Sequence, residues 1–318
     1  MRIIYMGTPE FAVESLKQLL EHNYTIVGVI TVPDKPAGRG QQLQQSAVKK
    51  FALEKGLTIL QPEKLKEEQF LEQLRGLKAD LQIVVAFRML PEVVWNMPRL
   101  GTFNLHGSLL PQYRGAAPIN WAVMNGEHET GVSTFFLQHE IDTGKIIFRE
   151  KVTIAENETA GEIHDKLMYT GAQLVVKTVQ AIEAGNYPQT DQSELVAQGT
   201  VLKSAPKIFK EDCRIDWNKA ASEIHNHIRG LSPYPTAFTD FISPEGKEFS
   251  VKVFRSRKED AVVPHPVGTV LTDAKSYIKI ATLSGYVYID ELQVAGKKRM
   301  AVNEFLRGFS LNGQWKAI

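Results

Sequence analysis

Cysteine and long apolar runs are both scarce in this sequence, and each absence excludes a class of protein. One cysteine, Cys213, stands among 318 residues, so neither an internal disulfide nor a metal site of several thiolates is available. No stretch approaches the roughly 18 consecutive apolar residues that a membrane helix needs. The start, from Met1 into the strand-like run Arg2 to Met6, lacks the layout of a signal peptide. We therefore expect a cytoplasmic protein without membrane contact.

A strong net charge is also missing. The chain carries 37 basic and 36 acidic residues, a formal charge of +1, which by itself indicates no polyanionic partner. The charge is uneven along the chain, however. From Lys207 onward there are 17 basic and 13 acidic residues, which leaves 20 and 23 for the part before it. The C-terminal third is therefore the basic part.

The first part alternates short β-branched runs with helical segments, the pattern of a doubly wound parallel sheet in a Rossmann-like α/β fold. A long helix is expected from Thr159 to Gly185, because Thr159 and Glu162 form a capping box and apolar residues follow at near-helical spacing. The expected strands are Ile3 to Met6, Tyr24 to Thr31, Leu57 to Leu60, Leu81 to Ala86, Gly101 to Leu105 and Gly131 to Leu137.

A glycine-rich phosphate loop is absent after the first of these strands. The turn reads Gly7-Thr8-Pro9-Glu10-Phe11, without the further glycines that let a backbone approach a pyrophosphate, which argues against dinucleotide binding. Thr8 and Pro9 predict instead the N-cap and the first position of a helix.

The length favours two domains, or one large domain with an appendage. The composition turns polar from Gln189 to Thr200, which is typical of a linker over the surface. We predict one domain at 1–187, a linker at 188–206 and a second domain at 207–318. In the second, a helix over Lys219 to Arg229 precedes short strands separated by turn residues, which predicts a small OB-like β-barrel. These strands are Ala237 to Phe241, Phe249 to Phe254, Tyr277 to Thr282 and Tyr286 to Leu292.

Two polar side chains at the end of an apolar strand are the first candidates for chemistry. Asn104 and His106 stand at i and i+2, so they share one face, and Gly107 lets the chain turn after them. Ligands bind at the carboxyl ends of parallel strands in such sheets. Taken alone, the pair could equally well be structural, that is, a core asparagine and a hydrogen-bonded histidine near a turn.

The neighbouring motifs decide between these interpretations. Asn104 to Pro111 reads Asn-Leu-His-Gly-Ser-Leu-Leu-Pro, Tyr113 to Ile119 reads Tyr-Arg-Gly-Ala-Ala-Pro-Ile, and Ile141 to Gly144 reads Ile-Asp-Thr-Gly. These runs resemble the signature of the 10-formyltetrahydrofolate-dependent formyltransferases. Further runs, among them Pro33 to Gly40, resemble the members of that family that act on methionyl-tRNA. The other runs that carry this resemblance are Met6 to Phe11, Ala205 to Ile208 and Arg214 to Trp217.

The resemblance implies transfer of a formyl group from 10-formyltetrahydrofolate to the α-amino group of methionine on initiator methionyl-tRNA, and Asn104, His106 and Asp142 as the catalytic residues. Attack of the amine on the formyl carbon creates an oxyanion. Asn104 and a protonated His106 can donate to that oxygen. Asp142, if it faces His106, would favour the imidazolium form and could accept the amine's proton through a water. Taken alone, Asp142 is typical of a turn-capping aspartate.

Nucleophilic and metal chemistry are disfavoured. Ser108 is not in a Gly-x-Ser-x-Gly elbow, so direct transfer is expected rather than an acyl-enzyme. His225 and His227 stand at i and i+2 on a predicted helix and face different sides, so we interpret both as surface residues and expect no metal.

The resemblance also implies binding residues. Ser108, Leu109, Leu110 and Pro111 would form the loop that holds the folate, where Leu110 would line an apolar pocket. The loop of Arg39 would meet the tRNA acceptor end, although Gln41 and Gln42 follow where relatives often carry lysines. From their charge we add other basic candidates for tRNA contact, although such clusters are more often solvated faces. These are Lys207, Lys297, Lys298 and Arg299, beside Arg255 to Lys258.

Other acceptors and classes stay open at this point. Formyltransferases that act on amino sugar nucleotides share the Asn104 to Pro111 run, and the Pro36 to Gly40 loop is what favours tRNA. A nucleotide-making formyltransferase would be shorter and of one domain. A non-catalytic RNA-binding protein would not retain Asn104, His106 and Asp142 together. We expect a monomer.

Overall fold

A computed structural model describes residues 1–37 and 42–318, so the predicted tRNA contact Arg39 lies outside the described residues. The chain forms two compact units. The first, which we call the sheet unit, comprises Met1–Gly115, Thr130–Val152 and His164–Ser204. The second, the barrel unit, comprises Ala116–Glu129, Thr153–Ile163 and Ala205–Ile318. Neither unit is continuous in sequence, and the predicted boundaries at 187 and 206 stay a prediction.

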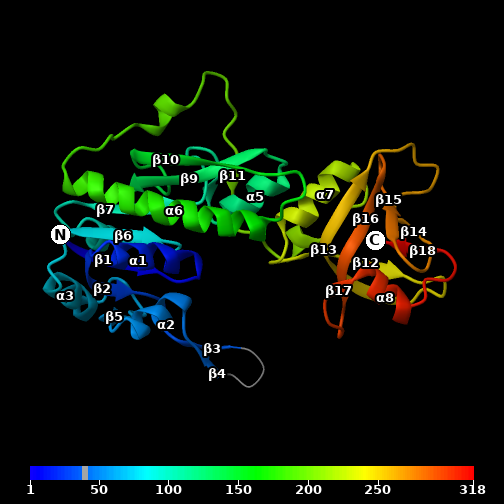
Figure 1. Cartoon of the computed structure of the whole chain (residues 1–318), viewed down its shortest axis with the longest axis horizontal. Coiled ribbons are helices and arrows are strands. Elements are labelled where there is room, and N and C mark those ends of the chain that lie inside the picture. The colour runs from blue at the N-terminus through cyan, green and yellow to red at the C-terminus, as the bar shows by residue number, and fades with distance from the viewer. Residues whose placement is uncertain (38–41) are drawn as a thin grey trace. The chain divides into compact units, whose positions relative to one another are not determined.

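The sheet unit is built on a seven-stranded sheet of the order β10-β9-β7-β6-β1-β2-β5 (Figure 1). Strands β7, β6, β1, β2 and β5 are parallel to one another, as the alternating pattern predicts, whereas β9 is antiparallel to β7. The edge strand β10 is not among the predicted strands. The bounds are β1 Arg2–Gly7, β2 Thr25–Ile30, β5 Ile59–Leu60, β6 Leu81–Val85, β7 Thr102–His106, β9 Glu129–Phe136 and β10 Ile146–Thr153.

Both faces of this sheet are covered because successive residues of its buried strands point to opposite sides. On β1, Tyr5 donates from its hydroxyl to the carbonyl of Ala12 in α1 (Phe11–Glu21) at 2.5 Å. Ile4 and Met6 pack on the other face with residues of α3 (Glu68–Gly76) and α4 (Glu92–Trp95). This arrangement is the doubly wound α/β architecture expected from the sequence.

Two helix starts test the predicted caps. Helix α6 (Ala160–Glu183) begins where predicted: the Thr159 amide donates to Glu162 Oε2 at 2.8 Å, and the Glu162 amide donates to Thr159 Oγ1 at 3.3 Å. The N-cap predicted at Thr8 is wrong. Helix α1 begins at Phe11, and the Thr8 hydroxyl is buried without a hydrogen-bond partner among the described residues. Pro9 contributes its carbonyl, which accepts from the Ala12 amide at 3.0 Å.

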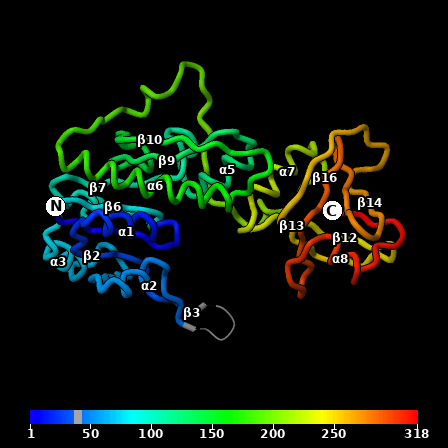
Figure 2. Tube along the Cα trace, viewed as in Figure 1, coloured from blue at the N-terminus to red at the C-terminus, as the bar shows by residue number. Residues whose placement is uncertain are grey.

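The barrel unit contains a closed antiparallel barrel, as predicted. Its sheet has the order β13-β12-β18-β14-β15-β16-β17, and the additional pairing of β13 with β16 closes it (Figure 2). Buried residues at alternate positions, such as Val251 and Val253 on β13, fill the interior. The strands are β12 Ala237–Ile242, β13 Glu248–Glu259, β14 Thr269–Thr272, β15 Ile278–Ala281, β16 Tyr286–Val294, β17 Met300–Ala301 and β18 Trp315–Ala317.

The remaining elements are helices and short strands outside the two seven-stranded sheets. In the barrel unit, Ile224 and Ile228 of α7 (Ala221–Gly230) belong to the barrel's buried cluster. None of the helices in the described ranges combines the length and apolar character needed to cross a bilayer. The other bounds are β3 Lys35–Ala37, β4 Gln42–Gln44, α2 Ala47–Glu54, β8 Arg114–Gly115, α5 Pro118–Met124, η1 Gln192–Leu195, β11 Ser204–Ala205, η2 Glu211–Cys213 and α8 Val302–Gly308.

Candidate active site

The predicted pair Asn104 and His106 lies on β7, inside the sheet. Leu105 between them packs against α6: a Cβ at Gly171 would lie 2.7 Å from Leu105 Cδ2. The strand alternation therefore turns Asn104 and His106 to the opposite face, as predicted. His106 is the last residue of β7 and pairs with Ser133 of β9, so its ring stands where the strand ends.

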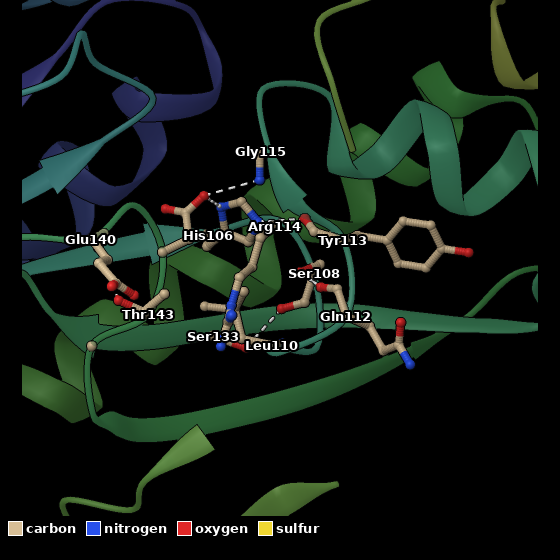
Figure 3. Close-up of polar contacts among 12 residues, drawn as sticks. His106, Ser108, Leu110, Gln112, Tyr113, Arg114, Gly115, Ser133, Glu140 and Thr143 are labelled. Carbon is tan, nitrogen blue, oxygen red and sulfur yellow. Dashed lines mark hydrogen bonds and ion pairs between the residues drawn. The ribbon is translucent and has the colours of Figure 1, made fainter. Parts of the chain in front are cut away.

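His106 is held between the backbone of one loop and the carboxylate of another (Figure 3). Its Nε2 lies 2.9 Å from the carbonyl oxygen of Tyr113. Because a carbonyl oxygen only accepts, Nε2 must carry a proton and donate it there. Its Nδ1 lies 3.9 Å from Asp142 Oδ2, and both side chains are nearly buried. The ring thus presents Nδ1, and not Nε2, to the neighbourhood of Asp142.

Asp142 reaches this position from the turn between β9 and β10. Its backbone has a φ of +55°, in the left-handed region that a short polar side chain tolerates better than most. The Gly115 amide donates to Asp142 Oδ2 at 3.0 Å. Gly144 closes the turn tightly, since a Cβ there would lie 1.6 Å from the carbonyl oxygen of Phe136. His106 and Asp142, which are 36 positions apart in sequence, are therefore neighbours in space.

Asn104 differs from its neighbours in hydrogen bonding. In the part of the chain that the structure describes, its Oδ1 is buried and has no hydrogen-bond partner. A buried acceptor without a partner costs about 1–3 kcal/mol, so such groups in native proteins usually meet a water or a ligand. The Oδ1 of Asn104 is therefore a candidate to accept a hydrogen bond from a bound molecule.

The loop Ser108 to Pro111 is a rigid, internally bonded turn. Ser108 Oγ donates to the Gln112 carbonyl at 2.6 Å, and the Leu110 amide donates to Ser133 Oγ at 3.0 Å. Ser133 Oγ in turn donates to the Ser108 carbonyl at 2.7 Å. Leu110 is fully buried, in contact with the core cluster of Phe135 and Ile146. It therefore belongs to the core.

An open cavity of about 770 Å³ lies next to this loop in the sheet unit. Leu109 and Pro111 line it, and Leu110 is not among its lining residues. The expectation that Leu110 lines an apolar pocket is therefore not met at this cavity. Strand β10 contributes Ile147 and Arg149, and the segment after η1 contributes residues including Leu202. Both polar and apolar groups face this cavity.

The predicted basic residues of the barrel unit are exposed but differ in their partners. Arg299 donates from Nε and Nη2 to the two carboxylate oxygens of Glu291, each at 2.6 Å. Lys298 Nζ lies 3.3 Å from Glu304. The Lys297 side chain has no partner among the described residues, and Lys207 Nζ lies 5.3 Å from the centre of the Phe209 ring. These residues do not form one uniformly free cationic patch.

The interpretation of His225 and His227 as surface residues is wrong. His225 is buried and its Nδ1 lies 3.0 Å from Ser256 Oγ. Burial lowers the pKa of His225, and it also lowers the pKa of the partly buried His227. Cys213 is buried, and its thiol donates to the Phe209 carbonyl at 3.3 Å; burial and the nearby Asp212 raise its pKa. Over the described residues, no group of three or more histidine, cysteine, aspartate or glutamate side chains is arranged to hold a metal.

Sequence reasoning missed the residues that position the site. Tyr113 and Gly115 act through backbone atoms, which no side-chain motif reveals. Gln192 lies in the segment predicted to be a surface linker, yet only 4% of its surface is exposed. Its neighbours Asp191 and Ser193 are exposed, as predicted for a linker. A single glutamine in a polar stretch carries no signal that it is buried.

Two family models and many sequence relatives match this chain. A family model described as "Formyl transferase" matches residues 1–179, and one described as "Formyl transferase, C-terminal domain" matches residues 207–310. The chain is similar to a methionyl-tRNA formyltransferase of Bacteroides thetaiotaomicron, with 59% identity over 316 residues that cover 99% of this chain and 98% of the relative. A relative of the same name from Phocaeicola vulgatus is 59% identical over 310 residues, 97% and 96% of the two chains.

Solved structures share the fold at lower identity. The fold is similar to that of a sugar 3N-formyl transferase whose crystal structure was determined in the presence of dTDP and 5-N-formyl-THF. The TM-score is 0.64 at 23% identity, with 94% of this chain and 99% of that chain covered. At this identity the likeness shows the architecture alone.

Proposed function

Because the chain belongs to the formyl transferase family, we propose that it transfers the formyl group of 10-formyltetrahydrofolate to the α-amino group of methionine on initiator methionyl-tRNA. The observation that carries this proposal is the 59% identity over 99% of the chain with a relative of that name. Translation initiation is the process that uses this product.

The proposed reaction is a direct transfer between two nitrogen atoms. The free α-amino nitrogen attacks the formyl carbon, and the carbonyl oxygen of the formyl group becomes an oxyanion. The bond between the formyl carbon and the folate nitrogen then breaks. The attacking amine loses one proton and the folate nitrogen gains one, so the products are formylmethionyl-tRNA and tetrahydrofolate. No protein nucleophile takes part.

The hydrogen bonding of His106 supports Nδ1 as the ring atom that serves the oxyanion. Nε2–H is taken by the Tyr113 carbonyl at 2.9 Å, so only Nδ1 is available for the reacting oxygen. A donating Nδ1 means that the ring carries both protons. The carboxylate of Asp142, 3.9 Å from Nδ1, offsets that positive charge. The Tyr113 carbonyl on one side and the Asp142 carboxylate on the other leave the ring little freedom to turn.

Asn104 supplies a second polar group on the same strand face. Its amide hydrogens donate to the developing oxyanion, and preorganised donors of this kind are worth roughly 10²–10³ in rate each. Its buried Oδ1 has no partner among the described residues and is suited to accept a hydrogen bond from the attacking amine. One amide group would thus contact both reacting partners.

Asp142 has two roles in this scheme. Its Oδ2 is oriented by the Gly115 amide and lies near His106 Nδ1. It balances the imidazolium charge and accepts, through a water, the proton that the amine loses. A carboxylate fixed by a backbone donor can do both without moving.

For the folate, we propose contacts from the loop Ser108 to Pro111. The buried side chains of Ser108 and Leu110 already have protein partners, so folate contacts fall to Leu109, Pro111 and backbone groups. A pre-formed loop of this kind binds with little loss of its own freedom.

The rival acceptor is an amino sugar nucleotide. The sugar 3N-formyl transferase among the solved structures shares the fold, but its sequence is only 23% identical to this chain. The relatives near 59% identity carry the methionyl-tRNA name. The balance of observations therefore favours tRNA.

The deciding experiment offers both acceptors to the same protein. Labelled 10-formyltetrahydrofolate is incubated with charged initiator tRNA in one reaction and with an amino sugar nucleotide in another. We expect label on the methionyl-tRNA. Label on the sugar nucleotide alone, or no transfer to tRNA at saturating folate, would reject the proposal.

A further inference from the structure

Gln192 is buried in a segment, 189–200, whose other residues are exposed or half-buried, and its carboxamide is fully hydrogen-bonded. Nε2 donates to the carbonyl of Asp142 at 2.8 Å and to the carbonyl of Gly144 at 2.9 Å. Oε1 accepts from Arg114 Nε at 3.1 Å and from Arg114 Nη2 at 2.6 Å. Both donors and both acceptor sites of the amide are therefore used.

These four bonds join the two loops that hold the catalytic pair. Asp142 and Gly144 belong to the turn that carries the carboxylate. Arg114 stands between Tyr113, whose carbonyl meets His106 Nε2, and Gly115, whose amide holds Asp142 Oδ2. Gln192 therefore bonds to Asp142 itself and to Arg114. Arg114 is adjacent in sequence to both residues whose backbone contacts His106 or Asp142.

The turn needs such support because its own backbone is unfavourable. Asp142 has a φ of +55°, a conformation that costs free energy for a residue other than glycine and persists only when its surroundings hold it. The bonds from Gln192 Nε2 grip the backbone at Asp142 itself and two residues later. Removal of these donors would take one hydrogen bond from the buried carbonyl of Gly144 and one from the partly buried carbonyl of Asp142.

We propose that Gln192 is a positioning residue that fixes the Asp142 carboxylate at His106 and so sets the turnover rate; this role rests on the proposed function. Both ends of its carboxamide are bonded to protein groups, so in this role Gln192 makes no contact with the reacting partners. It acts through the turn at Asp142 and through Arg114. A linker residue is thereby part of the apparatus that aligns the site.

The test is a double-mutant cycle of Gln192→Met with Asp142→Asn. Methionine keeps the length of the side chain and removes all four hydrogen bonds. We expect Gln192→Met to lower kcat about tenfold, with the KM of either substrate changed less than about twofold, because the defect lies in alignment. In the Asp142→Asn background the same substitution should lower kcat by less than about twofold, since the group it positions is already disabled.

Two further variants sharpen the result. Gln192→Glu keeps an acceptor for Arg114 and loses the donors to Asp142 and Gly144, so we expect it to fail to restore kcat. Gln198→Ala replaces an exposed glutamine of the same segment and should leave kcat unchanged. An equal loss of kcat from Gln192→Met in both backgrounds, or full activity in Gln192→Glu, would overturn the role.

Amide hydrogen exchange tests the role without any activity measurement. In Gln192→Met, exchange of the Gly115 amide, the donor to Asp142, should accelerate at least about tenfold while that of Val251 in the barrel stays unchanged. Equal acceleration at both amides would show global destabilisation and overturn the role. If the wild-type protein transfers no formyl group to tRNA, the proposed function fails, and exchange still decides whether Gln192 holds the turn.

Discussion

The candidate functional residues of the two units differ in how completely their polar groups are paired. In the barrel unit, arginines close on carboxylates: Arg257 Nε lies 3.0 Å from both oxygens of Asp290, and Arg299 holds Glu291 through two bonds. In the sheet unit, Asn104 is half-buried, and its buried Oδ1 is unpaired among the described residues. His106 Nδ1 approaches Asp142 only to 3.9 Å. These arginines of the barrel unit are thus paired within the protein, whereas the site of the sheet unit holds a buried acceptor that the described residues leave unpaired.

The contrast separates structural from functional polarity. Exposed ion pairs contribute little to stability, about 0–1 kcal/mol each, but they occupy charges that a polyanion would otherwise meet. An incomplete buried group costs stability and is retained where a substrate completes it. A count of charges therefore overstates the free cations of a surface, whereas an unpaired buried acceptor on the same strand face as a histidine marks a candidate site.

The largest expected effect comes from removing the pair in the sheet unit. His106→Ala and Asp142→Ala should each lower kcat by at least ~10³-fold, because the oxyanion loses its charged donor or that donor loses its counter-charge. Single-turnover transfer to methionyl-tRNA measures this. Affinity for tRNA should stay within about twofold of wild type. A parallel loss of tRNA affinity would show that the pair is structural.

Asn104→Ala should have the next largest effect, a loss of roughly 10²–10³ in kcat. The substitution also removes the unpaired buried Oδ1, so the protein should unfold at the same or a slightly higher temperature. Kinetics and thermal unfolding of the same preparation check both statements. A marked fall in the unfolding temperature would mean that Asn104 serves the fold, and the contrast between the two units would then fail.

In the barrel unit, the pairing of charges predicts unequal effects on tRNA binding. Lys297→Ala should weaken binding and reduce the slope of log Kd against log salt by about 1, as expected for one lost phosphate contact. Arg299→Ala should change the slope less, because Glu291 already holds the guanidinium. Titrations at several salt concentrations measure the slopes. Equal slopes for the two variants would show that pairing does not restrain Arg299.

The smallest expected effect concerns the buried histidine of the barrel unit. Burial lowers the pKa of His225, so below its ordinary pKa of about 6.5 the unfolded chain binds a proton that the folded chain does not. This contribution to stability is complete above about pH 6.5 and declines as the pH falls. The unfolding temperature should drop between about pH 7.5 and about pH 5.5.

A matched pair of variants isolates this contribution. His225→Gln should show a smaller drop over the same pH range, whereas His22→Gln, at an exposed histidine of the sheet unit, should show the wild-type drop. The same drop in His225→Gln as in the wild type would exclude His225 as its source.

The protonation of Glu162 affects stability at lower pH. Burial alone would raise its pKa, but bonds from Thr159 and Arg255 outweigh burial and lower it to about 2.

Much of the fold could be predicted because its signals are local. The capping box of Thr159 and Glu162 forms within one turn, and strand alternation places Asn104 and His106 on one face. Thr8 shows the limit of local signals, since an N-cap residue needs a backbone geometry that its sequence does not specify, and the helix begins at Phe11. His225 likewise reads as exposed on a polar helix and is buried by a distant strand.

The amino-acid sequence by itself determined the strand-and-helix alternation, the shared face of Asn104 and His106, and the motifs that place the chain in its family. Only the tertiary structure decided which ring nitrogen of His106 is free, that Asp142 stands 3.9 Å from it, and that Gln192 holds the turn between them. The physical reason is range. Periodicity and capping depend on residues within a turn or a strand, whereas these contacts join segments 7 to 50 residues apart through the packing of the whole sheet.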